Sequence, residues 1–167
     1  MRDEAGWMRE ALGEARRALA HGDVPVGAIV VQLSSGLVVG RAHNTRELDH
    51  DPTAHAELTA IRSASAAAGR WRLDDHVLVA TLEPCPMCAG AIWAARLPLL
   101  VFGAADAKAG AAGSLYNLGA DPRLNHETEI VPGVLAEECG ALLTEFFRER
   151  RGSDPPHGTA RQGREGR

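Results

Sequence analysis

Two short segments of this sequence carry the side chains best suited to chemistry. Cys85 and Cys88 lie in Glu-Pro-Cys-Pro-Met-Cys, and His55 and Glu57 lie in Thr-Ala-His-Ala-Glu. Two thiolates on the first turn of a helix can bind one metal ion, and the helix N-terminus favours their ionised form. A neutral imidazole from His55 would complete three ligands of tetrahedral zinc. The fourth position would then be left for water, which indicates catalysis.

Glu57 has a different predicted role from its neighbour His55. The two residues are two positions apart, and positions i and i+2 of a helix point to different sides. We therefore expect the Glu57 carboxylate to lie beside the metal rather than on it. A carboxylate in that place can take a proton from water and deliver it to a departing amine. Together the two segments predict a hydrolytic zinc site with Glu57 as its proton shuttle.

The cysteines alone leave other interpretations open. Cys-x-x-Cys after a strand is also the pattern of thioredoxin-type redox sites, and a purely structural zinc site is a further alternative. Neither alternative uses the His-Ala-Glu segment that precedes Cys85 by about 30 residues. The third cysteine, Cys139, falls on the apolar stripe of a predicted helix, where a free thiol behaves as a small hydrophobe. An odd number of cysteines, two of them close together, favours a reducing compartment over a disulfide framework.

Length, composition and charge limit the classes of protein to be considered. A chain of 167 residues with 45% hydrophobic content fits one compact domain, predicted over residues 1–151. No apolar stretch approaches the ~20 residues that span a bilayer, and the acidic N-terminus has no signal core, so we expect a cytoplasmic protein. The net charge of −4 argues against indiscriminate nucleic-acid binding. Any contact with RNA must therefore be local and specific.

The order of the predicted elements indicates an α/β fold. Hydrophobic periodicity predicts a helix over 7–19, and two β-branched runs predict a hairpin over 24–32 and 37–42. Further helices are expected at 53–68, 86–96 and 135–151, and strands at 76–80, 99–102 and 128–131. This alternation implies parallel crossovers, and we predict a three-layer α/β/α sandwich with a central five-stranded mixed sheet. Residues 103–113 are expected to form a loop, and residues 152–167 a disordered tail.

The two chemical segments resemble the signature of the cytidine deaminase superfamily, His-x-Glu followed by Pro-Cys-x-x-Cys. Other segments narrow the resemblance, which covers residues 7–151, to the bacterial tRNA-specific adenosine deaminases. The resemblance implies a cytidine deaminase-like fold, one Zn²⁺ per chain, and conversion of the wobble adenosine of a tRNA anticodon to inosine. The segments are Asp23–Ala28, Asn44, Asp51–Glu57, Phe102–Ala104, Asp106–Lys108, Gly113–Leu115, Asn125–His126 and Phe146–Arg148.

The same resemblance implies substrate contacts that the residues alone do not establish. Without the resemblance, Asp106 would be an ordinary turn aspartate, Lys108 a solvated lysine, and the end of the last predicted helix an ordinary amphipathic helix end. The implied positions are Asn44 for the flipped base, Val26, Ala28 and Ala56 for its pocket, Asp106 and Lys108 for the neighbouring nucleotides, and Phe147, Arg148, Arg150 and Arg151 for the anticodon loop.

The resemblance further implies a homodimer across the active-site helices. Ile92, Trp93 and Leu97 are the candidate interface residues, although simple core packing would explain the same apolar pattern.

Two positions depart from the family: Ala105 stands where such enzymes often have a basic residue, and His43 where some have Trp. A deaminase of free bases or nucleosides, of the guanine or cytosine type, would need only the zinc machinery and a closed pocket. It is the alternative function.

Overall fold

The computed structural model describes residues 2–153, and it confirms the predicted α/β fold. Eleven elements follow one another along these residues. The helices are α1 (Glu4–Ala18), continued by the 3-10 turn η1 (Leu19–His21), α2 (Arg46–Asp49), α3 (Ala56–Ala68), α4 (Pro86–Ala94) and α5 (Ala136–Ser153); the strands are β1 (Gly27–Gln32), β2 (Val38–His43), β3 (His76–Leu82), β4 (Leu99–Ala104) and β5 (Glu129–Val131).

The five strands form one mixed sheet in the order β2-β1-β3-β4-β5. β1 is antiparallel to both of its neighbours, whereas β3, β4 and β5 are mutually parallel. Because β2 and β3 both run opposite to β1, they run in the same direction. The helices that follow these two strands, α3 and α4, therefore begin at the same edge of the sheet, which brings two helix N-termini close together.

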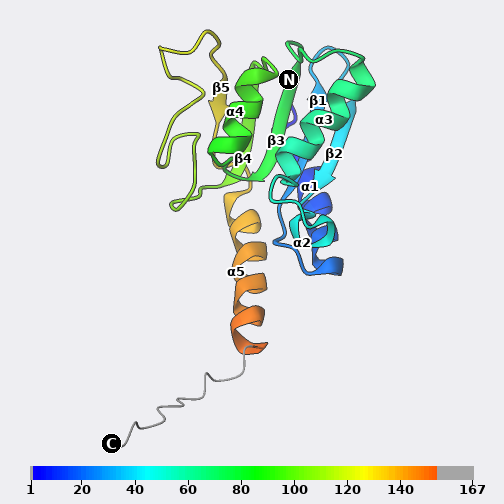
Figure 1. Cartoon of the computed structure of the whole chain (residues 1–167), viewed down its shortest axis with the longest axis vertical. Helices are drawn as coiled ribbons and strands as arrows, with labels where there is room; N and C mark the ends of the chain where they lie inside the picture. Colours follow the sequence, from blue (N-terminus) through cyan, green and yellow to red (C-terminus); the bar gives the residue numbers. More distant parts are fainter. Residues whose placement is uncertain (1, 154–167) are drawn as a thin grey trace, which may run out of the picture.

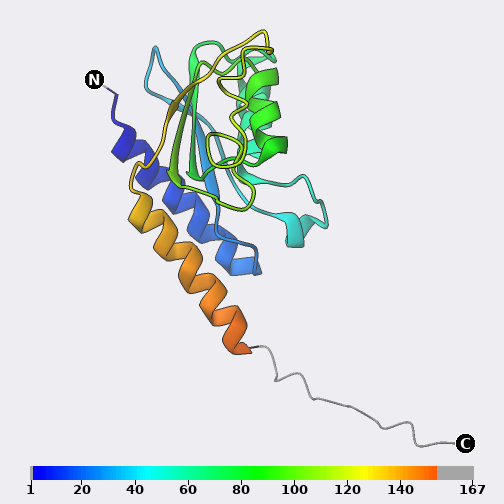
Figure 2. The same cartoon turned by 90° about the vertical axis from the view of Figure 1, so that its left-hand side faces the viewer.

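Helices cover both faces of the sheet and give the predicted three layers (Figures 1 and 2). α3 and α4 pack on one face, and α1 and α5 on the other. Successive residues of β3 alternate between the two layers, with Leu78 facing α3 and α4, and Val79 facing α1 and α5. This is the two-residue period of a strand, and β3 is buried on both sides because each face has its own helices.

The start of α3 differs from the prediction. Thr53 is not the N-cap, because its backbone N–H and its hydroxyl both donate to Asp51 Oδ1, each at 2.7 Å. This local turn competes with helix formation, and the N-cap falls on His55, whose backbone is extended (φ −77°, ψ 146°). His55 therefore precedes the helix, and Glu57 is the second residue within it.

Other boundaries shift for local reasons. Val24 and Pro25 were expected in the first strand, but β1 begins at Gly27, and Pro25 has no N–H to donate to a sheet. The short helix α2 was not predicted. α5 continues to Ser153, two residues beyond its predicted end, so most of the predicted tail, residues 154–167, lies outside the described residues. No helix within residues 2–153 is long and apolar enough to cross a membrane.

Candidate functional site

The common edge at which α3 and α4 begin carries the predicted metal ligands. His55 is the N-cap of α3, and Cys85 is the N-cap of α4. Pro86 occupies the first position of α4, where its fixed φ suits the helix and its missing N–H costs nothing. Cys88 then falls on the first turn of α4, facing the start of α3.

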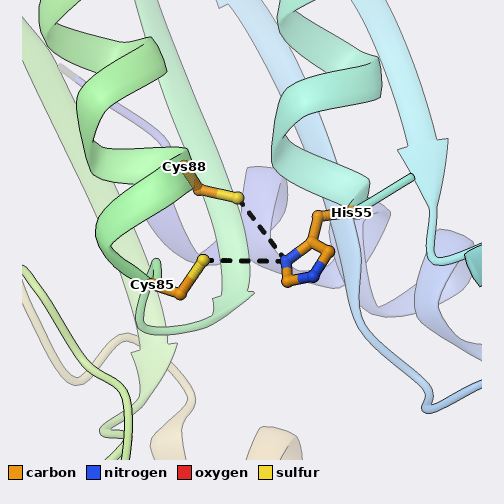
Figure 3. A group of neighbouring side chains, drawn as sticks. All are labelled: His55, Cys85 and Cys88. Atoms are coloured by element: carbon orange, nitrogen blue, oxygen red, sulfur yellow. Dashed lines mark hydrogen bonds between the residues drawn. The ribbon is translucent and has the colours of Figure 1, made fainter. Parts of the chain in front are cut away.

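The three ligand side chains converge in space (Figure 3). The nitrogen His55 Nδ1 lies 3.8 Å from Cys85 Sγ and 3.6 Å from Cys88 Sγ. All three ligand atoms lie within 4.8 Å of one another, and they are the only such group of three among residues 2–153. The sequence prediction that residues separated by 30 positions would meet at one point is borne out by this geometry.

A hydrogen bond between the two thiols shifts their pKa values in opposite directions. The Cys88 thiol donates to Cys85, which, with the neighbouring His55, lowers the pKa of Cys85 to about 3 and raises the pKa of Cys88. The hydrogen bond with Cys85 likewise raises the pKa of His55. One imidazole nitrogen and two sulfurs are the donor set that zinc prefers, with a position left over for a further ligand. The residues therefore fit a zinc ion.

Glu57 lies beside the three ligands without belonging to their group. Its side chain is only 3% exposed, and among the described residues its Oε2 atom has no hydrogen-bond partner. Burial raises the pKa of Glu57 to about 7. A carboxyl group with such a pKa can both accept and release a proton near neutral pH, which is the property required of a proton shuttle.

A cavity of about 660 Å³ opens over this group. Its walls come from the segment before β1, the junction of β2 and α2, the start of α3, the segment from the end of β3 to the start of α4, the loop after β4, and the middle of α5. His55, Glu57 and Cys85 face it directly, and apolar side chains such as Val26 and Leu143 line its sides. A volume between 300 and 1,000 Å³ with few polar groups is typical of small-molecule or base-binding sites.

Comparison with known proteins decides which family has this arrangement. A family model described as MafB19-like deaminase matches residues 2–151. A tRNA-specific adenosine deaminase of Bacillus subtilis is 50% identical over 145 residues, which are 87% of this chain and 89% of that protein. The chain belongs to the tRNA-specific adenosine deaminase family. The family resemblance of the two chemical segments is thereby confirmed.

Solved structures agree with membership of the tRNA-specific adenosine deaminase family. A structure from a study of A-to-I editing by tRNA:A34 deaminases at the wobble position has a TM-score of 0.78 and 40% identity, and covers 83% of this chain and 99% of that one. A guanine deaminase of Bacillus subtilis is more distant, with a TM-score of 0.58 and 29% identity, over 95% of this chain and 99% of that one. The cytidine deaminase-like fold is therefore confirmed.

The structure brings many of the family's implied substrate residues to the cavity. Asn44 is 6% exposed there, where its Oδ1 accepts from the backbone N–H of Ala56 at 3.0 Å and its Nδ2 donates to the carbonyl of Val24 at 3.1 Å. The amide thus uses one of its two donors and one of its acceptor lone pairs, which leaves polar capacity for a base. Asp106, Lys108, Phe147 and Val26 also line the cavity.

Five implied contact residues do not line this cavity, and one of them, Arg151, is exposed near the end of α5. Ala28 and Ala56 are fully buried in the core cluster under α3 and α4, behind the cavity wall. Arg148 pairs with Glu145 at 3.6 Å, as expected of residues three apart on a helix. Arg150 reaches back from α5 to donate to the carbonyl of Gly22 at 2.9 Å. Its role here is to tie α5 to the turn after α1.

The candidate interface residues divide between core and surface. Ile92 and Leu97 are 3% and 0% exposed within a single chain, so they belong to the core cluster under α3 and α4. Trp93 is only partly buried and lines a shallow apolar depression beside α4.

Cys139 is 1% exposed in the other core cluster, and burial raises the pKa of its thiol to about 11. Its predicted packing role is confirmed.

Two charged residues that line the cavity had no predicted role. Arg46, at the start of α2, is a cation at the rim. Glu83 is a buried carboxylate between β3 and Cys85. Burial acts to raise the pKa of Glu83, but hydrogen bonds from Ser114, Asp106 and Ala112 outweigh it and hold the pKa below its usual range. The sequence signal for Glu83 was its place next to Pro84 and Cys85 in the metal-binding segment.

Proposed function

We propose that this chain hydrolyses adenosine to inosine at the wobble position of a tRNA anticodon. The observation that carries the proposal is the convergence of His55, Cys85 and Cys88 beside the buried Glu57, at the floor of the cavity. Family membership supplies the substrate class, because relatives named tRNA-specific adenosine deaminase align over most of their length with this chain.

His55 Nδ1, Cys85 Sγ and Cys88 Sγ would hold one zinc ion. A bound ion of this kind supplies a Lewis acid that lets water act as hydroxide near neutral pH. The two cysteines would contribute thiolates: hydrogen bonds from Cys88 and His55 already lower the pKa of Cys85, whereas Cys88, whose pKa is raised, would lose its proton on binding the ion at the first turn of α4. The partly exposed position of Cys85 and His55 at the cavity floor keeps the reaction centre accessible to a base.

Glu57 performs the proton transfers of the hydrolysis. Water adds to C6 of adenine and forms the new C–O bond, the C6–N6 bond breaks, and ammonia leaves. The Glu57 carboxylate takes a proton from the attacking water and delivers it to the departing amine, so that one water is consumed for each ammonia released. Its burial and its pKa of about 7 suit both transfers.

Recognition of the RNA is proposed to be local. A base flipped from the anticodon loop would enter the cavity, where Asn44 offers its remaining amide donor, and Ala28 and Ala56 shape the wall from behind. At the rim, Lys108 and Arg46 can meet phosphates, Asp106 can meet a neighbouring base, and Phe147, 43% exposed, offers a stacking surface. Arg148 and Arg151, exposed beyond Phe147 on α5, would add contacts to the loop.

Metal analysis and turnover of four single variants test the assigned roles. His55→Ala, Cys85→Ala and Cys88→Ala should each lose stoichiometric zinc, because each removes one of three ligands. Glu57→Ala should retain the zinc and lower turnover by about 10²- to 10⁴-fold, the usual contribution of a general acid–base group. Loss of zinc in the Glu57→Ala variant would make Glu57 a ligand and would contradict the proton-shuttle assignment.

We further propose that the chain forms a homodimer and acts in the cytoplasm. The partly exposed Trp93 and the apolar depression beside α4 support an interface on the outer face of that helix. Light scattering should then give twice the 17.7 kDa mass of one chain, and Trp93→Arg should return the mass to that of a monomer. A wild-type mass of 17.7 kDa would rule out the dimer. The cytoplasm is where tRNA is available and where cysteine ligands stay reduced.

A further inference from the structure

Glu83 holds an unusual position for a carboxylate. It directly follows β3, lies two residues before Cys85, and is 2% exposed. Its Oε1 atom accepts from the backbone N–H groups of Ala112 at 3.1 Å and Ser114 at 2.9 Å. Its Oε2 atom accepts from the backbone N–H of Asp106 at 2.9 Å and from the Ser114 hydroxyl. Four donors thus surround one buried side chain, and all of them belong to residues 106–114.

The segment 106–114 is folded around this carboxylate. A Cβ atom added to Gly110 would lie 2.3 Å from Glu83 Cδ and 2.4 Å and 2.5 Å from its two oxygens. Only glycine permits so close an approach of backbone to carboxylate. The backbone of Ala111 also donates to the carbonyl of Pro84 at 2.8 Å, so the same segment is attached to the residue between Glu83 and Cys85.

The contacts continue from Glu83 to the residues proposed to meet RNA. Asp106, whose N–H is bound by Glu83, accepts in turn from the N–H groups of Lys108 at 2.9 Å and Ala109 at 3.1 Å. Glu83, Cys85, Asp106 and Lys108 all line the cavity. Two successive hydrogen bonds therefore connect Glu83 to the backbone of Lys108: the first joins Glu83 to the N–H of Asp106, and the second joins the Asp106 carboxylate to the N–H of Lys108. In this way Glu83 fixes the position of Lys108 in the loop.

We propose that Glu83 is a positioning residue for substrate recognition, which fixes the segment 106–114 relative to Cys85 so that Asp106 and Lys108 meet the nucleotides flanking the reacting base. This inference rests on the proposed function and assigns the loop's geometry to one side chain. Glu83 has no part in the chemical step; its effect is transmitted through the backbone of the loop.

The isosteric change Glu83→Gln separates this role from simple space filling. A carboxamide has one acceptor oxygen and one NH₂ donor, whereas the site presents donors to both oxygens. The better orientation keeps the oxygen toward Ala112 and Ser114, and turns the NH₂ group toward the N–H of Asp106. The bond that is lost is therefore the one leading to Asp106 and Lys108, while the volume of the side chain is unchanged.

Steady-state kinetics on an anticodon stem-loop, with zinc content and hydrogen exchange of the zinc-loaded protein, test the inference. Glu83→Gln should keep its zinc and lower kcat/KM by about 10- to 100-fold, the value of one hydrogen bond to a charged group, mainly through a higher KM. Exchange in peptides covering 106–114 should rise by at least about tenfold, with the peptides of β1 and α3 unchanged. Unchanged exchange in 106–114 would overturn the proposal.

Two other variants probe the same contact from the side of the loop. Gly110→Ala should reproduce the kinetic and exchange changes, because its methyl group would displace the carboxylate. Gly13→Ala, in α1, is the matched control, since a Cβ there meets no atom within 4 Å, and it should change neither measurement. Ser114→Ala removes one of four donors and gives a milder change in the same direction if Glu83→Gln fails to fold. If hydrogen exchange in peptides covering 106–114 stays at the wild-type rate in both Gly110→Ala and Ser114→Ala, the positioning role of Glu83 is refuted.

A double-mutant cycle distinguishes positioning from general destabilisation. If Glu83 acts by placing Lys108, then Glu83→Gln should lower kcat/KM by less than about threefold in a Lys108→Ala background. Full additivity would show that Glu83 only stabilises the fold. If the wild-type chain forms no inosine in the stem-loop, the proposed function fails, and the exchange measurements still decide whether Glu83 holds the loop.

Discussion

Asn44 joins three parts of the chain at the edge of the cavity, and its replacement has a predictable cost. The residue follows β2, and its amide connects the carbonyl of Val24, before β1, to the N–H of Ala56, the first residue of α3. Because α3 begins between His55 and Glu57, the Asn44 side chain also helps to hold the proposed metal ligand and the proposed proton shuttle in place.

We predict that Asn44→Ala lowers the free energy of unfolding by about 2 kcal/mol. The Ala56 N–H is buried, and a buried donor without a partner costs about 1–3 kcal/mol. The Val24 carbonyl is only partly buried beside the cavity, where water can replace the amide at a cost of about 0–1 kcal/mol. A loss of this size is a large fraction of the roughly 5–15 kcal/mol that stabilises a domain.

Asn44→Asp provides the matched comparison. A carboxylate can still accept from the Ala56 N–H at the start of α3, where negative charge is favourable, but it cannot donate to the Val24 carbonyl. Its destabilisation should be about 1 kcal/mol, smaller than that of Asn44→Ala. Urea unfolding of the zinc-loaded proteins at pH 7 measures both values. Ordinary surface substitutions change the unfolding free energy by up to about 0.5 kcal/mol. A smaller change in Asn44→Ala would contradict a stabilising role of the Asn44 amide. An Asn44→Asp variant less stable than Asn44→Ala would contradict it as well.

Two further predictions concern residues away from the cavity floor. Cys139→Ala should keep full zinc content and lose about 1 kcal/mol of stability, because Cys139 packs in the core; complete loss of metal would contradict this. Burial acts to raise the pKa of Asp23, but bonds from the N–H groups of Glu47 and Leu48 and from His21 lower it below 3.8. Asp23→Asn should therefore lower the free energy of unfolding by about 1–3 kcal/mol above about pH 4. Its difference from wild type should become smaller at lower pH, where the Asp23 carboxylate is protonated, and a difference that became larger at lower pH would contradict the prediction.

The convergence of the three proposed metal ligands was predictable from the sequence because they have rare chemical types at fixed spacings. His55, Cys85 and Cys88 meet as expected, since the helices that carry them follow two strands of the same direction. The layers of the fold were predictable for a similar reason, because β-branched runs alternate with helical periodicity over most of the chain. Both predictions depend on patterns within single elements, taken together with the order of those elements along the chain.

The missed features depend on contacts between distant segments or on local competition. The N-cap moved from Thr53 to His55 because the Asp51 side chain binds Thr53 first. The hydrogen bonds that order the loop after β4 were not predicted, because their acceptor, Glu83, lies more than 20 residues earlier in the chain. The resemblance implied a pocket role for Ala28 and Ala56, and the structure adds that both are fully buried and that neither lines the cavity.

Product analysis on matched substrates tests the central claim most directly. The zinc-loaded protein would be incubated with an anticodon stem-loop carrying adenosine at the wobble position, and separately with free adenosine, cytidine and guanine, with inosine and ammonia measured in each. A free nucleoside lacks the flanking nucleotides that we propose for the cavity residues Lys108, Asp106 and Phe147, and it therefore lacks their positioning energy for catalysis. We predict inosine in the stem-loop and negligible ammonia from the free compounds. Efficient ammonia release from a free base, with an unreacted stem-loop, would contradict it.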